Sequence, residues 1–150
     1  MAQRQSGGGR GPDRLPPMAA QDLSPEQTAA AAAFEAARGV PVFGPFWPLI
    51  RSPQLMLRAH EMGQYLRYNG SLPHALSEMA ILLVSSHWKN PVEWEIHCPA
   101  ALKAGLPQTV VEAIAKGERP AAMSPQETVV FEAFQQLHRD RAIDDTLYAK

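Results

Sequence analysis

One segment of the sequence carries two side chains that could exchange a proton. Glu93 and His97 lie four residues apart within Asn90–Cys98, so both side chains leave the same face of a helix. An imidazole titrates close to neutral pH, and a carboxylate beside it can shift that titration. The pair is therefore typical of a general acid–base site.

A third ionisable residue, Glu78, lies nineteen positions before His97 in a strongly apolar segment. Apolar residues nearly encircle the helix expected over 73–88, which indicates a central, buried helix. A buried carboxylate without a partner is costly and tends to take up a proton, so we expect Glu78 to share a wet pocket with His97. The alternative is a structural ion pair with one of three arginines, Arg51, Arg58 or Arg67.

Both residues of the Glu–His pair also have structural explanations. Glu93 is the third helical position after Asn90, where a capping-box glutamate reaches back to the backbone N–H of the cap. His97 could be a core histidine with satisfied hydrogen bonds. Glu95 points away from the face of Glu93 and His97 and is expected to be a solvated or pairing charge.

Four further side chains are candidates for substrate binding. His87, Trp88 and Trp94 could line the mouth of a pocket, although tryptophans in such helices are more often core or interface residues. Arg58 could hold a substrate carboxylate.

Neither a metal nor another cofactor is predicted. A metal site built from Glu78, His87 and His97 is disfavoured, because no HxxxH or HExxH pattern supports it. The single cysteine, Cys98, is expected to be a small buried hydrophobic residue.

Composition limits the class of protein. The chain has 150 residues, is 45% hydrophobic and carries a formal net charge of −1, which fits a domain with a moderate core and argues against a nucleic-acid partner. No run of about 18 apolar residues predicts a membrane span, and no apolar block follows the N-terminal arginines as in a secretory signal. One cysteine makes the reducing cytoplasm the expected compartment.

The chain is expected to consist of a tail and one helical domain. Residues 1–22 are rich in Gly, Arg, Pro and Gln, which predicts a disordered tail, and residues 23–150 form the domain. Strand signals are nearly absent, so the fold is predicted to be all-α. Helices are expected near 25–38, 53–68, 73–88, 91–104, 107–116, 125–138 and 143–150.

Three of these helices share one start signal. Ser24-Pro25, Asn90-Pro91 and Ser124-Pro125 each pair a cap residue with proline at the first helical position, and Gln or Glu follows three residues after the cap. This pattern predicts three capping boxes. Between the first two helices, Val40–Leu49 contains three prolines and three aromatic residues and is predicted to be non-helical. We expect it to pack over a pocket or a partner subunit, or simply to cover the core.

The order of these features resembles the carboxymuconolactone decarboxylase-like family, which shares the AhpD-like all-α fold. The resemblance runs from roughly Phe46 to Lys116 and rests on Glu78, then Glu93-Trp94-x-x-His97, then Gly105-Leu106-Pro107. It implies a bundle of six to seven helices and a homo-oligomer, a trimer or hexamer, with sites near subunit contacts. Such chains often continue with another long helix after the Tyr148 region, so the contacts of that segment are expected to be missing or rearranged.

The resemblance further implies a cofactor-free decarboxylase for a small carboxylated lactone or a related unsaturated acid. Loss of CO₂ leaves electrons that a conjugated carbonyl absorbs, and the protein stabilises an enolate-like oxygen and returns a proton to carbon. His97 is expected to donate or accept that proton. Glu93 would orient His97, and Glu78 would tune or relay protons.

Two alternatives belong to other classes of function. The alkylhydroperoxidase branch of the group (peroxiredoxin activity) uses a CxxC pair, whose cysteines would fall at Asn90 and Glu93 by spacing from His97. Cys98 is no substitute, because it projects about 100° from His97 on a helix. The other alternative is a non-catalytic oligomeric binding protein, which the apolar segment Val40–Leu49 supports.

Overall fold

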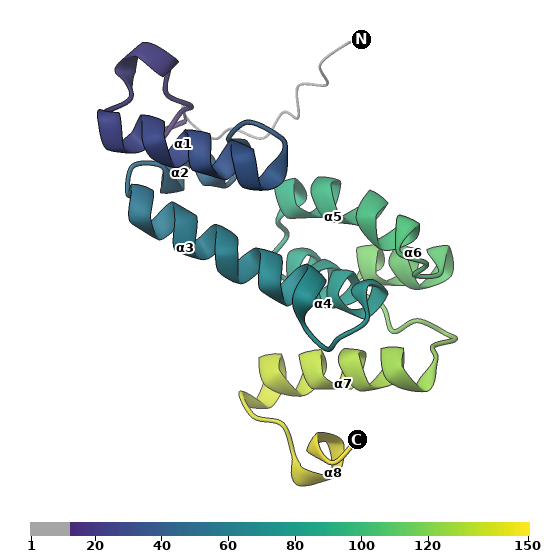
Figure 1. Ribbon diagram of the computed structural model, residues 1–150. Helices are drawn as coiled ribbons and strands as arrows, with labels where there is room; N and C mark the ends of the chain where they lie inside the picture. The colour runs from purple at the N-terminus through teal and green to yellow at the C-terminus, as the bar shows by residue number, and fades with distance from the viewer. Residues whose placement is uncertain (1–12) are drawn as a thin grey trace. The chain divides into compact units, whose positions relative to one another are not determined.

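The computed structural model describes residues 13–150 as helices joined by loops, with no strand among them (Figure 1). The predicted all-α fold is confirmed. The chain divides into two compact units, one that ends at Met62 and one from Gly63 to Lys150. None of the helices in the described part of the chain is both long and apolar enough to cross a membrane.

Every helix predicted from the sequence is present. The helix predicted over 53–68 is α-helical only to Gln64 and continues as a π-helical turn, η2 (Tyr65–Asn69). A short 3-10 turn, η1, covers Ala20–Asp22. The α-helices are α1 (Pro25–Arg38), α2 (Phe46–Leu49), α3 (Pro53–Gln64), α4 (His74–His87), α5 (Pro91–Lys103), α6 (Gln108–Lys116), α7 (Pro125–Asp140) and α8 (Asp145–Tyr148).

The prediction that the whole of Val40–Leu49 is non-helical is wrong for its last four residues. Phe46–Leu49 forms the one-turn helix α2. Pro48 is tolerated there because the first backbone N–H groups of a helix have no intrahelical partner, so a missing N–H costs little.

The segment predicted as a disordered tail is only partly described, since residues 1–12 lie outside the described residues. From residue 13 onward it makes defined contacts. Met18 packs against the hydrophobic cluster of the N-terminal unit, and Pro16 O accepts a hydrogen bond of 2.8 Å from Arg51 Nη2. Local contacts therefore begin before residue 23.

The N-terminal unit is held by an aromatic cluster. Phe34 on α1 is fully buried, and its ring centroid lies 4.6 Å from that of Phe46. The guanidinium of Arg38 lies 5.0 Å from the Phe46 centroid and 5.4 Å from that of Phe43, within the range of cation–π attraction. Val40–Leu49 therefore covers the core of its own unit, which was one of the predicted roles of this segment.

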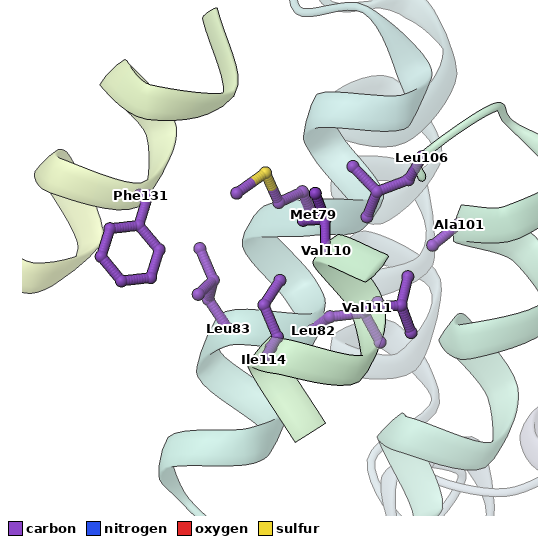
Figure 2. Close-up of a cluster of buried hydrophobic side chains, with 9 residues drawn as sticks. All are labelled: Met79, Leu82, Leu83, Ala101, Leu106, Val110, Val111, Ile114 and Phe131. Carbon is purple, nitrogen blue, oxygen red and sulfur yellow. The ribbon is translucent and has the colours of Figure 1, made fainter. Parts of the chain in front are cut away.

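The core of the C-terminal unit gathers around α4 (Figure 2). Helix α4 contacts α5, α6 and α7, which confirms the central, buried helix predicted from its nearly continuous apolar surface. Burial of each large aliphatic side chain contributes about 1.5–3 kcal/mol. The cluster consists of Met79, Leu82, Leu83, Ala101, Leu106, Val110, Val111, Ile114 and Phe131.

The tight connection between α4 and α5 sets the register of the two helices. Lys89 adopts a left-handed conformation with φ of 51°, which is uncommon for a residue with a Cβ. The next residue, Asn90, donates its backbone N–H to Ser85 O over 2.9 Å. Its side-chain Oδ1 caps α5 by accepting from Val92 N and Glu93 N. Only three residues thus lie between the end of α4 and the start of α5, and the two helices pack directly against each other.

Candidate active site

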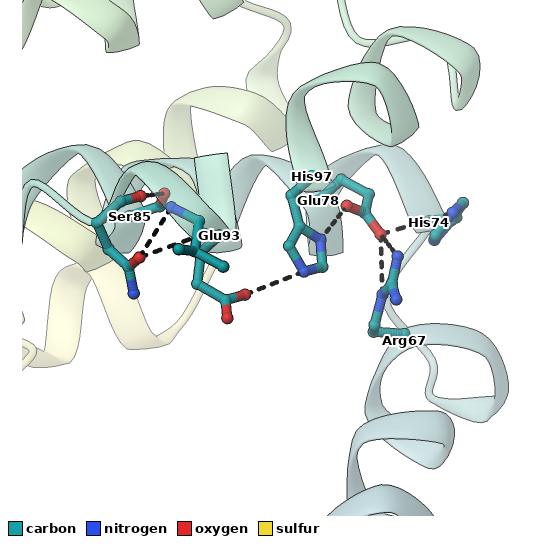
Figure 3. A network of polar contacts seen from close by, with 8 residues as sticks. Arg67, His74, Glu78, Ser85, Glu93 and His97 are labelled. Carbon is teal, nitrogen blue, oxygen red and sulfur yellow. Dashed lines mark hydrogen bonds and ion pairs between the residues drawn. The ribbon is translucent and has the colours of Figure 1, made fainter. Parts of the chain in front are cut away.

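Glu78 on α4 is the centre of a buried polar network (Figure 3). Its side chain is fully buried, and each carboxylate oxygen has its own partner. Oε2 lies 2.7 Å from His97 Nδ1. Oε1 accepts hydrogen bonds from Arg67, at 2.6 Å from Nη2 and 3.0 Å from Nε. The neighbouring helices therefore bring together two residues predicted from sequence and one of the three candidate arginines.

The network keeps Glu78 ionised. Burial by itself would raise the pKa of Glu78, but the hydrogen bonds from His97 and Arg67 and the positive charge beside it outweigh burial, so the pKa is lowered. An ionised carboxylate only accepts hydrogen bonds, so Nδ1 of His97 must carry a proton. In the neutral ring, Nε2 is then the atom that can accept one.

Arg67 reaches Glu78 from the π-helical turn η2. A π-helical turn accommodates one more residue per hydrogen-bonded loop than an α-helix, which changes the direction of the side chains that follow, and such turns occur frequently at functional sites. From the sequence, Arg67 was only one of three possible ion-pair partners for Glu78. The sequence could not single out Arg67, because the 3.6-residue period of an α-helix does not hold through η2.

Glu93 lies on the other side of the His97 ring. Its Oε2 is 3.3 Å from His97 Nε2, and its side chain is 31% exposed, against 9% for His97. One face of α5 therefore presents a buried imidazole and a partly exposed carboxylate, as the four-residue spacing predicts. The series of contacts that starts at Glu78 and passes through His97 therefore ends at Glu93, near the surface.

Glu93 behaves differently from the residues at the same position in the other two predicted capping boxes. Both reciprocal hydrogen bonds of a capping box are present between Ser24 and Gln27 and between Ser124 and Glu127. At Asn90 the cap side chain accepts from the helix, but the Glu93 carboxylate does not reach back to the cap N–H. The prediction of a third capping box is therefore wrong for one of its two hydrogen bonds, the one from the Asn90 N–H to the Glu93 carboxylate. That carboxylate lies against His97 instead.

A cavity of about 470 Å³ opens beside Glu93. Its walls are almost entirely apolar, and Glu93 is the ionisable side chain among its lining residues. Its lining residues are Ala80, Ile81, Val84, Ser85, Trp88, Asn90 and Glu93.

The cavity does not reach Glu78, which is sealed between Arg67 and His97. The prediction that Glu78 shares a water-filled pocket with His97 is therefore wrong, because the guanidinium of Arg67 and the imidazole of His97 occupy both carboxylate oxygens. The alternative prediction, an ion pair with Arg67, is confirmed.

His74, the first residue of α4, is a further member of this network that was not predicted from the sequence. Its Nε2 lies 3.7 Å from Glu78 Oε1, and its ring centroid is 5.2 Å from that of Tyr68. His74 Nδ1 and Ser77 Oγ are buried without a hydrogen-bond partner. The four-residue spacing between His74 and Glu78 is the signal that could have identified this contact.

The residues predicted to line the pocket are separated by the structure. Trp88 lines the cavity beside Glu93. His87 lines a second cavity instead, and Trp94 lines neither, because it packs against the core of the C-terminal unit. Arg58 lies on α3 in the N-terminal unit, and its role stays a prediction.

Two other features bear on the chemistry. Cys98 packs against the hydrophobic core, as predicted, but it is half-buried and not fully buried. Among residues 13–150, no group of three or more His, Cys, Asp or Glu side chains is placed to hold a metal ion. Beside the cavity, Glu93 and His97 are two groups that can each donate or accept a proton.

The helices and the buried Glu78–His97 pair define an all-α protein with a candidate acid–base centre. The family model of the Carboxymuconolactone decarboxylase family matches residues 53–136, which is more than half of the chain. The chain therefore belongs to this family, as the sequence resemblance indicated. No curated protein and no solved structure matches it.

Proposed function

We propose that the protein is a cofactor-free carboxy-lyase that acts on a small carboxylated lactone or a related unsaturated acid. The observation that carries this proposal is the chain Glu78–His97–Glu93, which starts at a fully buried carboxylate and ends at the wall of an apolar cavity. The cavity, of about 470 Å³, falls within the range of small-molecule sites.

The distances favour a different division of roles from the one expected from sequence. Glu78 orients His97, because it holds Nδ1 at 2.7 Å and is itself fixed by Arg67. Nε2 then faces Glu93 at 3.3 Å, and a proton can pass between the two. Glu93, which lines the cavity, is the group that meets the substrate.

The reaction requires one bond to break and one proton to be delivered. The bond between the substrate carbon and its carboxylate breaks, CO₂ leaves, and the electron pair enters the conjugated carbonyl to give an enolate. Glu93, protonated through His97, gives its proton to carbon, and solvent returns a proton to the pair. Asn90 lines the cavity, and because its Oδ1 caps α5, its NH₂ group would donate to the enolate oxygen.

The apolar walls assist the same step. Ala80, Ile81, Val84 and Trp88 surround the space beside Glu93, and they cannot replace the water that solvates a substrate carboxylate. A localised carboxylate is therefore disfavoured in the cavity relative to neutral CO₂ and a delocalised enolate.

We also propose that the protein is a homo-oligomer whose partner subunit covers the cavity. Val84 and Trp88, which line the cavity, are 43% and 70% exposed, and Val92 in the first turn of α5 is 50% exposed. Large apolar side chains gathered in this way are typical of interaction surfaces. Light scattering coupled to gel filtration tests the proposal, and a monomer at micromolar concentration would contradict it.

The test of the activity is release of CO₂ from a panel of carboxylated lactones and unsaturated acids. We expect turnover of at least one member by the wild type. His97→Gln should lower its rate by about 10²–10⁴-fold, the usual contribution of general acid–base catalysis. Circular dichroism and the Tm of the variant serve as the control for folding. An equal rate in a folded His97→Gln variant, or no release from the whole panel by the wild type, would contradict the proposal.

A further inference from the structure

A second cavity, of about 340 Å³, lies where the C-terminal parts of three helices meet. His87, the last residue of α4, and His138, in the last turn of α7, both line it. The end of α6 contributes Gly117 and Glu118. The proposed decarboxylation uses none of these residues.

The two histidines come from segments far apart in the sequence, yet their ring centroids are only 4.5 Å apart. Phe134 completes the group, at 4.0 Å from the His138 centroid and 5.7 Å from that of His87. Two positively charged imidazolium rings this close would repel each other. A neutral pair, by contrast, offers two nitrogen ligands on two different helices.

The hydrogen bond of His138 suits a metal ligand. Its Nδ1 lies 2.9 Å from the carbonyl oxygen of Phe134, and a carbonyl only accepts, so Nδ1 carries the proton. In the neutral ring, Nε2 then presents a lone pair. A metal-binding histidine almost always donates its other ring N–H in this way to a carbonyl or carboxylate.

The electrostatic surroundings favour a cation. A helix carries a partial negative charge at its C-terminus, and residues in the last turns of α4 and α7 and directly after α6 line this cavity. The carboxylate of Glu118 adds to it. The positive charge of Arg139 is neutralised locally, because Arg139 donates hydrogen bonds to both carboxylate oxygens of Asp140.

We propose that His87 and His138 bind one divalent transition-metal ion, of the class of Zn²⁺, Ni²⁺ or Cu²⁺, for which imidazole is a suitable ligand. The ion would tie the end of α4 to the end of α7, with Glu118 nearby and water in the remaining positions. The proposed site has two protein ligands, since no set of three such side chains is placed for a metal among the described residues. It is independent of the proposed decarboxylase.

Calorimetric titration of Zn²⁺, Ni²⁺ and Cu²⁺ into the untagged, metal-free protein tests this site, since a polyhistidine tag would bind the same ions. We expect one equivalent to bind and to raise the Tm. The double substitution His87→Gln and His138→Gln should weaken binding at least tenfold and abolish the rise in Tm. The electron paramagnetic resonance spectrum of bound Cu²⁺ should show coupling to two nitrogens in the wild type.

A matched control removes the other histidine–carboxylate pair, by Glu93→Gln and His97→Gln. This variant should keep the metal affinity of the wild type. Equal binding by the wild type and the His87/His138 double variant would overturn the proposal. Loss of binding in the Glu93/His97 variant would overturn it as well, because the ion would then lie beside the first cavity.

Discussion

Oε2 of Glu78 and Nδ1 of His97 lie 2.7 Å apart, although nineteen residues separate them in the sequence. Helix α4 buries the carboxylate, and the short turn at Lys89 returns α5 so that His97 faces it. Arg67 holds the other oxygen, so the ring of His97 is fixed from one side. Because the ring is fixed, its Nε2 lies against Glu93. The contacts therefore run in one direction, from the buried carboxylate of Glu78 through His97 to the cavity.

Replacing Arg67 with Gln should destabilise the protein strongly. Glu78 would then be a fully buried carboxylate that has lost its guanidinium, and breaking a buried pair costs about 3–5 kcal/mol. Urea denaturation measures the loss. The control is Arg119→Gln, which breaks the exposed pair with Glu132 and should cost at most about 1 kcal/mol. Similar losses in the two variants would contradict the burial of the Arg67–Glu78 pair.

The stability of the protein should depend on pH through Glu78. Its folded-state pKa is lowered, so its contribution to the free energy of unfolding is full above the unfolded-state pKa of about 4.3. That contribution is lost as the pH falls below this value and through the folded-state pKa. Denaturation measured from neutral to acid pH should therefore show a steeper loss for the wild type than for Glu78→Gln. Parallel curves would show that Glu78 is not stabilised as an anion.

Two glutamates at equivalent positions after a cap should respond differently to alanine. Glu127→Ala removes a bond of 2.6 Å to Ser124 N and should cost about 0.3–1.5 kcal/mol, the usual range for a helix cap feature. Glu93→Ala removes no such bond, so its effect on stability should not include this term. Thermal denaturation of both variants checks the difference. A cap-sized loss from Glu93→Ala that persists in a His97→Gln background would show that Glu93 mainly caps α5.

Filling the cavity should impair substrate binding without unfolding the protein. Val84 lines the cavity and is 43% exposed, so Val84→Phe can be accommodated while it narrows the space beside Glu93. We expect a higher KM for any substrate found in the panel, while circular dichroism and gel filtration check that the fold and the oligomeric state are retained. Val92→Phe is the matched control for a bulkier side chain on the surface proposed to meet the partner subunit, because Val92 is similarly exposed but does not line the cavity. An unchanged KM in Val84→Phe would place the substrate elsewhere.

The helices were readable from the sequence because their start signals are local. Pro25 and Pro125 each follow a serine cap, and both helices begin at these prolines. The meeting of Glu78, Glu93 and His97 was also predictable, since a carboxylate in an apolar helix needs a partner and the i, i+4 pair defines a face. The catalytic roles of these three residues stay a proposal.

The rest depended on tertiary structure. Arg67 reaches Glu78 from a π-helical turn, which breaks the period used to assign faces. Glu93 matches a capping box in sequence, but the neighbouring imidazole takes its carboxylate. The sequence predicts that His87 and Trp88, which are adjacent, line the mouth of one pocket, yet at the end of α4 they line two different cavities.

The most direct test of the proposed site compares two carboxylates on α5 that are two residues apart. Glu93 lies against His97 and the cavity, whereas Glu95 is exposed. With a substrate from the panel, the rate of CO₂ release should fall by about 10²–10⁴-fold in Glu93→Gln and stay at the wild-type value in Glu95→Gln. Wild-type rates in a folded Glu93→Gln variant would contradict proton transfer through Glu93 and His97.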